Sequence, residues 1–141
     1  YYLPQALVKL GMGDGYLDWL DTWRKNIALG LTTWAESLNR DYTRSDCHAW
    51  GSSPNVEFFR VILGIDSAAP GFTQVKIQPH LGKLPKIGGQ MPHPNGMIEV
   101  QYQRVGKGIE AQSQLPPATT GYFVWEGQTF ALHPGSNTLK I

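Results

Sequence analysis

One short segment of the chain combines a carboxylate, a histidine and two tryptophans and lacks helical or strand periodicity. It contains Trp34 and Glu36, followed by His48 and Trp50. Loops held between regular elements carry a large share of binding and catalytic residues. Indole rings stack on the apolar face of a sugar, and a carboxylate handles the proton or the water of glycoside hydrolysis. We therefore predict a carbohydrate site in this loop.

The residues in and around this loop resemble a known family. The matching stretches are Thr32 to Glu36 (TTWAE), Arg44 to Pro54 (RSDCHAWGSSP), Leu63 to Ile65 (LGI) and Ala69 to Phe72 (APGF). Their order and spacing are similar to the C-terminal part of bacterial α-L-rhamnosidases, the inverting glycoside hydrolases of family 78. The resemblance extends over most of the chain and implies cleavage of terminal α-L-rhamnosides.

The resemblance also implies roles for particular residues. The general base of the family is a glutamate three residues after the second Thr of a Thr-Thr-x-x-Glu pattern, the place that Glu36 occupies. A histidine shortly after the base contacts the bound rhamnose, which implies this role for His48. Trp34 and Trp50 are candidate walls of the sugar site, although other members often carry Trp directly before the glutamate, where this chain has alanine. Asp46 is a candidate for orienting the imidazole, since carboxylates often do so.

Simpler interpretations of the same residues remain open. Glu36 could be a solvated loop residue, His48 a structural histidine bonded to the backbone, and either tryptophan a core residue. A metal site at Asp46, Cys47 and His48 is rejected, because successive residues rarely point at one ion and no second ligand cluster follows. We predict neither a metal nor a cofactor.

The second carboxylic acid that an inverting glycosidase requires is not evident. Asp14, Asp18 and Asp21 fall at and inside the start of a predicted helix, where the helix dipole favours negative charge. In the resembled family the general acid lies far upstream of the base, in an acidic segment with Arg and Trp. We expect this chain to hold the base without its acid partner.

The composition of the chain limits the classes of partner that it can bind. The net charge of +1 gives no electrostatic footprint for nucleic acid, and no apolar run is long enough to span a membrane. The single cysteine excludes an internal disulfide. The chain opens at Tyr1 without an initiator Met or signal pattern, so we expect a portion of a larger enzyme, with the N-terminal remainder and a rhamnose-containing glycoside or polysaccharide as its partners. Localisation is unknown, with the bacterial periplasm or secretion favoured over the cytoplasm.

Helical periodicity precedes the loop. Tyr16, Leu20, Trp23 and Ile27 follow the spacing i, i+4, i+7, i+11, which predicts a helix from about Gly15 to Leu29 that Gly30 ends. A shorter helix carries Leu3, Leu7 and Leu10 and ends at the glycines of positions 11–13. A third helix follows the loop, with Ser53 as N-cap, Pro54 at its first position and an apolar face made by Val56, Phe59 and Leu63.

After Phe72 the period changes to two, which predicts short strands separated by Gly-containing turns. We expect strands near residues 73–78, 86–91, 97–104, 107–114, 120–125, 128–133 and 137–141. Four aromatic residues in this part could form a second sugar-binding patch: Tyr122, Phe123, Trp125 and Phe130. Tyr122 and Trp125 fall on opposite faces of one strand, so core packing is the favoured interpretation.

The predicted fold is therefore an α+β multidomain fragment. Residues 1–70 would be the last helices of an (α/α)6 catalytic barrel, as the resemblance implies, and residues 71–141 an antiparallel β-sandwich. Two alternatives remain: a non-catalytic carbohydrate-binding module built on the sandwich, and another (α/α)6 glycosidase of trehalase-like or glucoamylase-like type.

Overall fold

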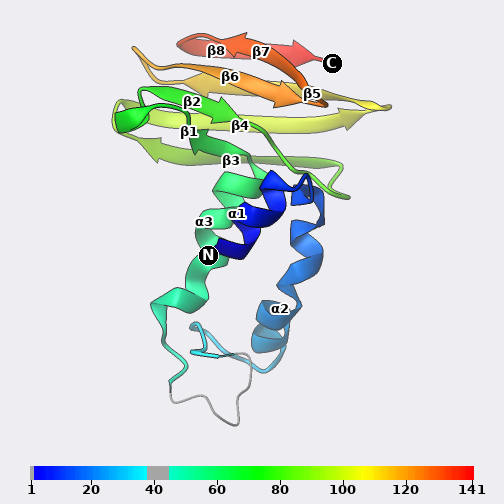
Figure 1. Ribbon diagram of the computed structural model, residues 1–141, viewed down its shortest axis with the longest axis vertical. Helices are drawn as coiled ribbons and strands as arrows, with labels where there is room; N and C mark the ends of the chain where they lie inside the picture. The colour runs from blue at the N-terminus through cyan, green and yellow to red at the C-terminus, as the bar shows by residue number, and fades with distance from the viewer. Residues whose placement is uncertain (1, 38–44) are drawn as a thin grey trace.

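The computed structural model describes residues 2–37 and 45–141. Figure 1 shows two stacked sheets at one end of the molecule and the helices extending away from them. The order of elements confirms the predicted α+β character, because every helix of more than one turn precedes the first strand.

Two helical segments form a hairpin before the loop. α1 spans Tyr2–Lys9, and Gly11 turns the chain with a φ of +75°. The single helix predicted from Gly15 to Leu29 is wrong in its first half, because a 3-10 helix, η1, spans Gly13–Leu20 and only then does α2 span Asp21–Ala28. The two glycines at the start of η1 disfavour the α conformation. Gly30 ends α2 with a φ of +78°, as predicted.

The third helical segment begins earlier and winds differently than predicted. A 3-10 turn, η3 (Ala49–Ser52), leads into α3 (Ser53–Glu57) and then into a π-helical turn, η4 (Phe58–Ile62). Ser53 is inside the helix rather than its N-cap, which is Ser52, and Ser52 makes no side-chain capping bond. The predicted apolar face is confirmed for Leu63, which is buried, and for Phe59, which packs against the core, but not for Val56, which is 46% exposed. Val61 and Ile62, within and at the end of the π turn, are buried as well.

The strands form two four-stranded sheets. One sheet has the order β1-β2-β6-β7 and the other the order β3-β4-β5-β8. Their bounds are β1 Ile65–Ser67, β2 Gln74–Ile77, β3 Lys86–His93, β4 Gly96–Val105, β5 Gly108–Leu115, β6 Thr120–Trp125, β7 Gln128–Leu132 and β8 Gly135–Lys140. All seven predicted strands are present, and β1 is an additional strand.

The sandwich core lies between the two sheets, and one pairing differs from the expected antiparallel pattern. Val75 and Phe123 of the first sheet face Val100 and Tyr102 of the second within one buried cluster. β2 and β6 pair in parallel, with Val75 opposite Gly121. These strands are far apart in the chain, so no hairpin imposes an antiparallel direction on them. The favoured core role of the aromatic residues in this part is confirmed for three of them, since Trp125 and Phe130 pack against the cluster that contains Phe123.

A second apolar cluster joins the helices to the sandwich. Its buried members are Tyr16, Leu20, Val61 and Ile62, and Ile87 of β3 packs against both clusters. Trp19 and Trp23 pack against this cluster, as expected for Trp23 from its place in the apolar stripe. Ile27, the last residue of the predicted stripe, is 70% exposed instead.

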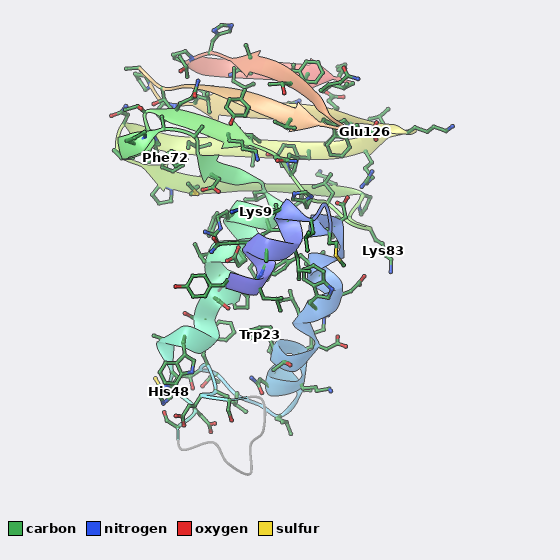
Figure 2. The ribbon with its side chains drawn as sticks, viewed as in Figure 1. Lys9, Trp23, His48, Phe72, Lys83 and Glu126 are labelled. Atoms are coloured by element: carbon green, nitrogen blue, oxygen red, sulfur yellow. The ribbon has the colours of Figure 1, made fainter. Side chains whose placement is uncertain are left out.

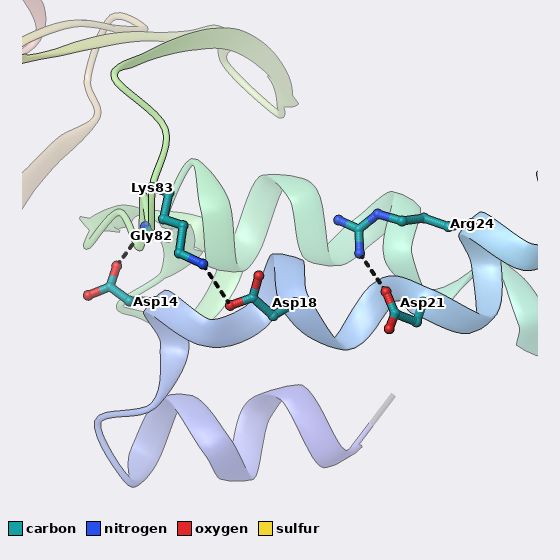
Figure 3. A network of polar contacts seen from close by, with 6 residues as sticks. All are labelled: Asp14, Asp18, Asp21, Arg24, Gly82 and Lys83. Carbon is teal, nitrogen blue, oxygen red and sulfur yellow. Dashed lines mark hydrogen bonds and ion pairs between the residues drawn. The ribbon is translucent and has the colours of Figure 1, made fainter.

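Polar contacts reinforce the same junction. Asp14 accepts a hydrogen bond from the backbone N–H of Gly82 at 3.0 Å, and Lys83 lies 3.9 Å from Asp18 (Figure 3). Asp21 pairs with Arg24 at 3.1 Å within α2. The ion pairs of Asp18 and Asp21 are exposed to solvent and therefore contribute little to the stability of the fold. Asp14 instead connects the start of η1 to the segment between β2 and β3.

A buried ion pair lies in α3 and η4. Glu57 is fully buried, and its Oε1 lies 2.5 Å from Nη2 of Arg60. Burial, together with the charge of Glu57, raises the pKa of Tyr16 to about 12.

The His80 ring packs over Gly13, where an added Cβ would lie 2.5 Å from Cγ of the ring. Burial lowers the pKa of His80, and within the described part of the chain its Nε2 has no hydrogen-bond partner.

Candidate functional site

Backbone hydrogen bonds bring the two halves of the predicted loop together. The N–H of Glu36 donates to the carbonyl of Ser45 at 3.0 Å, and the N–H of His48 donates to the carbonyl of Trp34 at 2.8 Å. The hydroxyl of Thr33 donates to the carbonyl of Asp46. Three contacts between residues 33–36 and 45–48 therefore fix the position of Glu36 relative to His48. Arg44, the first residue of the second matched stretch, lies outside the described residues.

The carboxylate and the imidazole face each other. Oε2 of Glu36 lies 4.0 Å from Nε2 of His48, and their side chains are 10% and 25% exposed. This separation is too long for a direct hydrogen bond. Both groups keep a path to solvent while most of each side chain is shielded. Such a pair can hold a small polar group, such as a water or a sugar hydroxyl, against both side chains.

Trp50 supports both members of this pair. Its indole N–H donates to the backbone carbonyl of Glu36 at 2.8 Å, and its ring lies 4.3 Å from the His48 ring, centroid to centroid, at an angle of 42°. Trp50 is also 65% exposed. An indole that is held by its N–H and exposed on its ring is suited to contact a sugar face.

Trp34 lies next to the site backbone and is half-buried. A Cβ on Gly51 would lie 3.0 Å from Cβ of Trp34 and 2.8 Å from the carbonyl oxygen of Ala35. Only glycine therefore allows the start of the third helical segment to approach this close. The role of Trp34 as a sugar wall stays a prediction.

Asp46 is exposed, and its backbone carbonyl is the group that receives the bond from Thr33. Beside it, the N–H of Cys47 donates to the hydroxyl of Ser45 at 3.1 Å. The proposed orienting effect of Asp46 on His48 stays a prediction.

One supporting contact was not predicted from the sequence. Nε1 of Trp23 in α2 donates to the carbonyl of Gly51 at 2.7 Å, so α2 anchors the far side of the loop. Figure 2 shows Trp23 within the helical part and His48 at the end that is remote from the sheets. The signal available in the sequence was an indole donor on the helix that precedes the loop.

The described residues contain neither a metal cluster nor a membrane-spanning helix. Within residues 2–37 and 45–141, no group of three His, Cys, Asp or Glu side chains could hold a metal ion. Over the same ranges, every helix is too short or too polar to cross a membrane.

Comparison with known families identifies the chain. The family described as the bacterial alpha-L-rhamnosidase C-terminal domain matches residues 64–135, just over half of the chain. The chain belongs to this family. The match begins one residue before β1 and includes β1 to β7. The resemblance of the sequence to α-L-rhamnosidases is thereby confirmed. No curated protein matches the chain.

Solved structures of α-L-rhamnosidases have the same fold. The enzyme from Aspergillus terreus is 21% identical with a TM-score of 0.85, and the similarity covers 97% of this chain and 18% of that one. The enzyme from Streptomyces avermitilis, solved in complex with L-rhamnose, is 19% identical with a TM-score of 0.71 and coverages of 84% and 14%. The enzyme from Dictyoglumus thermophilum is 19% identical with a TM-score of 0.71 and coverages of 82% and 17%. The chain thus spans less than a fifth of the length of these relatives.

Proposed function

We propose that this chain is the part of an α-L-rhamnosidase that carries the general base Glu36, and that the enzyme hydrolyses terminal α-L-rhamnosides with inversion. The observation that supports this proposal best is the 4.0 Å approach of Oε2 of Glu36 to Nε2 of His48, in a loop held by two backbone–backbone hydrogen bonds and one from the Thr33 hydroxyl. Membership of the rhamnosidase family supports the substrate class.

In the proposed reaction Glu36 acts as an ionised carboxylate. It removes a proton from a water molecule while the water oxygen bonds to the anomeric carbon and the glycosidic bond breaks. A second carboxylic acid, in the remainder of the enzyme, gives its proton to the leaving oxygen. In inverting enzymes the two carboxyl groups lie roughly 6.5–9.5 Å apart, which leaves room for the water.

His48, Trp50 and Trp34 would bind the sugar. A neutral imidazole donates from one nitrogen and accepts at the other, which suits two adjacent ring hydroxyls. Trp50 would cover the apolar face of the rhamnose ring, since much of its indole is exposed. The proposed chemistry needs two carboxyl groups and water, so we propose no cofactor.

We further propose that residues 1–70 are the last helices of an (α/α)6 barrel whose earlier helices belong to the N-terminal remainder of the enzyme. Exposed apolar side chains on these helices support this proposal, because the earlier helices of the barrel would cover them. Leu3 of α1 is 67% exposed, and Ile27 and Leu29 at the end of α2 are 70% and 60% exposed. A rhamnose-containing polysaccharide as substrate fits a periplasmic or secreted bacterial enzyme.

The test is Glu36→Gln in the full-length enzyme. Glutamine keeps the size of the side chain but cannot accept the proton of the attacking water. A general base contributes about 10²–10⁴-fold in rate, so kcat should fall by this factor, equal to roughly 3–5 kcal/mol. Sodium azide should restore turnover and yield the rhamnosyl azide of inverted configuration, because azide attacks without losing a proton.

Glu126→Gln is the matched control, because Glu126 is an exposed residue of the turn between β6 and β7. It should leave kcat unchanged. Near-normal turnover of Glu36→Gln, or no response of that variant to azide, would remove Glu36 from the role of base.

A further inference from the structure

The outward face of the β3-β4-β5-β8 sheet presents polar side chains in cross-strand register. On β4, Gln101 and Gln103 point outward, because Val100 and Tyr102 on either side of Gln101 are buried in the core. The central row of the face runs across all four strands through Gly88, Gln101, Gln112 and Thr138. Successive outward residues on a strand lie about 7 Å apart, and neighbouring strands about 4.8 Å apart. The face is therefore a regular grid of polar groups.

This face is hollowed. An open depression of about 490 Å³ lies over β3, β4 and β5, and a second of about 310 Å³ lies over β4, β5 and β8. Gln101 and Gln112 line both. Ligand pockets in proteins commonly measure about 300–1,000 Å³. Gly88 has no side chain to fill one end of the central row. A Cβ added there would lie only 3.0 Å from the side chain of Gln101. The face therefore forms a shallow trough with the amides of Gln101 and Gln112 at its centre.

The central amides have unused hydrogen-bonding capacity. Oε1 of Gln114 accepts a hydrogen bond from the Ser136 hydroxyl at 2.7 Å. Within residues 2–37 and 45–141, the side chains of Gln101 and Gln112 make no such bond to another side chain or to the backbone. Each amide offers two donors and one acceptor. Gln101 lies opposite Gln112 on adjacent antiparallel strands, so both can act on one ligand.

The charges on the face cancel. Lys86 and Lys140 are balanced by Glu99 and Glu110, and Lys140 lies 3.7 Å from Glu110. A nucleic acid or an acidic polymer would need an excess of positive charge. A neutral ligand rich in hydroxyl groups meets no unbalanced charge there.

A protein partner fits the face less well. The centre of a stable protein interface is enriched in aromatic and other apolar anchors. The outward apolar residues of β4, Met97 and Val105, lie at the two ends of the strand, beyond the central rows. The middle of the face offers amides, hydroxyls and a glycine, which match the hydroxyl groups of a sugar chain.

We propose that the outward face of the β3-β4-β5-β8 sheet binds a neutral oligosaccharide through the amides of Gln101 and Gln112. The inference goes beyond the proposed function, because it concerns the sandwich rather than the Glu36 loop and does not require Glu36 to be a base. In the whole enzyme such a site would hold the polysaccharide that carries the terminal sugar.

The test is a titration of the ¹⁵N-labelled 141-residue chain, followed by NMR. The probes are a rhamnose hexasaccharide and xylohexaose as neutral chains and hexagalacturonate as an acidic chain. A neutral hexasaccharide should shift the side-chain NH₂ signals of Gln101 and Gln112 with half-saturation at or below about 5 mM. Hexagalacturonate should bind more weakly than the neutral chain.

The double variant Gln101→Ala/Gln112→Ala should weaken binding roughly tenfold, because it removes two sets of hydrogen bonds from an exposed face. Gln128→Ala on β7 of the other sheet is the matched control and should change nothing. Thermal unfolding confirms that the variants fold, and the shift map of the unmodified chain tests the site independently of them. Glu36→Gln should bind the hexasaccharide normally even if hydrolysis by the enzyme is lost, so the two proposals fail separately.

Four results would overturn the inference. They are no shifts with either neutral chain at about 20 mM, shifts confined to other residues, equal affinity of the double variant, and equal binding of hexagalacturonate. A change in oligomeric state of the double variant without a change in sugar binding would show that the face contacts protein instead.

Discussion

The Glu57–Arg60 pair allows the junction between helices and sandwich to be tested quantitatively. Glu57 is fully buried, and Arg60 is 19% exposed by its side chain. Arg60→Met keeps the length and much of the volume of the side chain but leaves the carboxylate inside the junction without this cation. Removing one partner of a buried ion pair costs about 3–5 kcal/mol. Because Arg60 is not fully desolvated, we expect a loss of about 3 kcal/mol in the free energy of unfolding.

The assay is urea unfolding at pH 7, followed by the fluorescence of the five tryptophans. Glu57→Gln should cost less than Arg60→Met, since the arginine that remains can reach water. The double variant Glu57→Met/Arg60→Met should be more stable than Arg60→Met alone, because no charge is then buried. If Arg60→Met is within ~1 kcal/mol of the original chain, the carboxylate is not desolvated and the account of this pair is wrong.

Two further predictions concern the same region. Gly64→Ala should cost more than about 3 kcal/mol in urea unfolding, because its Cβ would lie 2.1 Å from the carbonyl carbon of Gln78 at a φ of +72°. Gly30→Ala, with a φ of +78° and open space around it, should cost only about 1–2 kcal/mol, and equal losses would contradict the steric account. Burial lowers the pKa of His80, so below about pH 6.5 the unfolded chain binds more protons at this residue than the folded chain does, and stability should fall as the pH falls further. Urea midpoints at pH 5 and pH 7.5 measure this fall, and His80→Gln should reduce it; an unchanged difference between the two pH values would exclude His80 as its source.

The strands were predictable from the sequence because their signals are local. The alternation of Ile98, Val100 and Tyr102 with polar residues defines β4. The turn of Pro94 and Asn95, followed by Gly96 as the first residue of β4, separates it from β3. Glycine likewise marked the end of α2 correctly at Gly30. Each of these features depends on neighbours within a few residues.

Features that depend on packing were not predictable in this way. The parallel pairing of β2 with β6 depends on strands brought together by the rest of the sandwich. The 3-10 segment η1 and the π turn η4 depart from the α-helical period that the apolar spacing indicated. The buried pair of Glu57 and Arg60 was missed, although opposite charges three residues apart on a helix were an available signal.

The candidate site shows the same division. The resemblance to α-L-rhamnosidases predicted Glu36 and His48 as site residues, and their side chains lie face to face in the structure. The sequence did not show that the indole N–H of Trp50 would bind the carbonyl of Glu36, or that Trp23 would anchor Gly51. Such contacts depend on the path of the backbone through an irregular loop.

The parallel pairing of β2 with β6 has a consequence for the order of folding. Residues 78–119 separate the two strands, so their direct encounter closes a loop of 42 residues. Closing such a loop costs on the order of 2–3 kcal/mol more entropy than closing a two-residue hairpin. The consecutive hairpins of β3, β4 and β5 avoid this cost, and once formed they bring Thr120 close to Gln74. We therefore expect the β3-β4-β5 meander to fold early and the first sheet to assemble on it afterwards, which makes the sandwich a slow folder for its size.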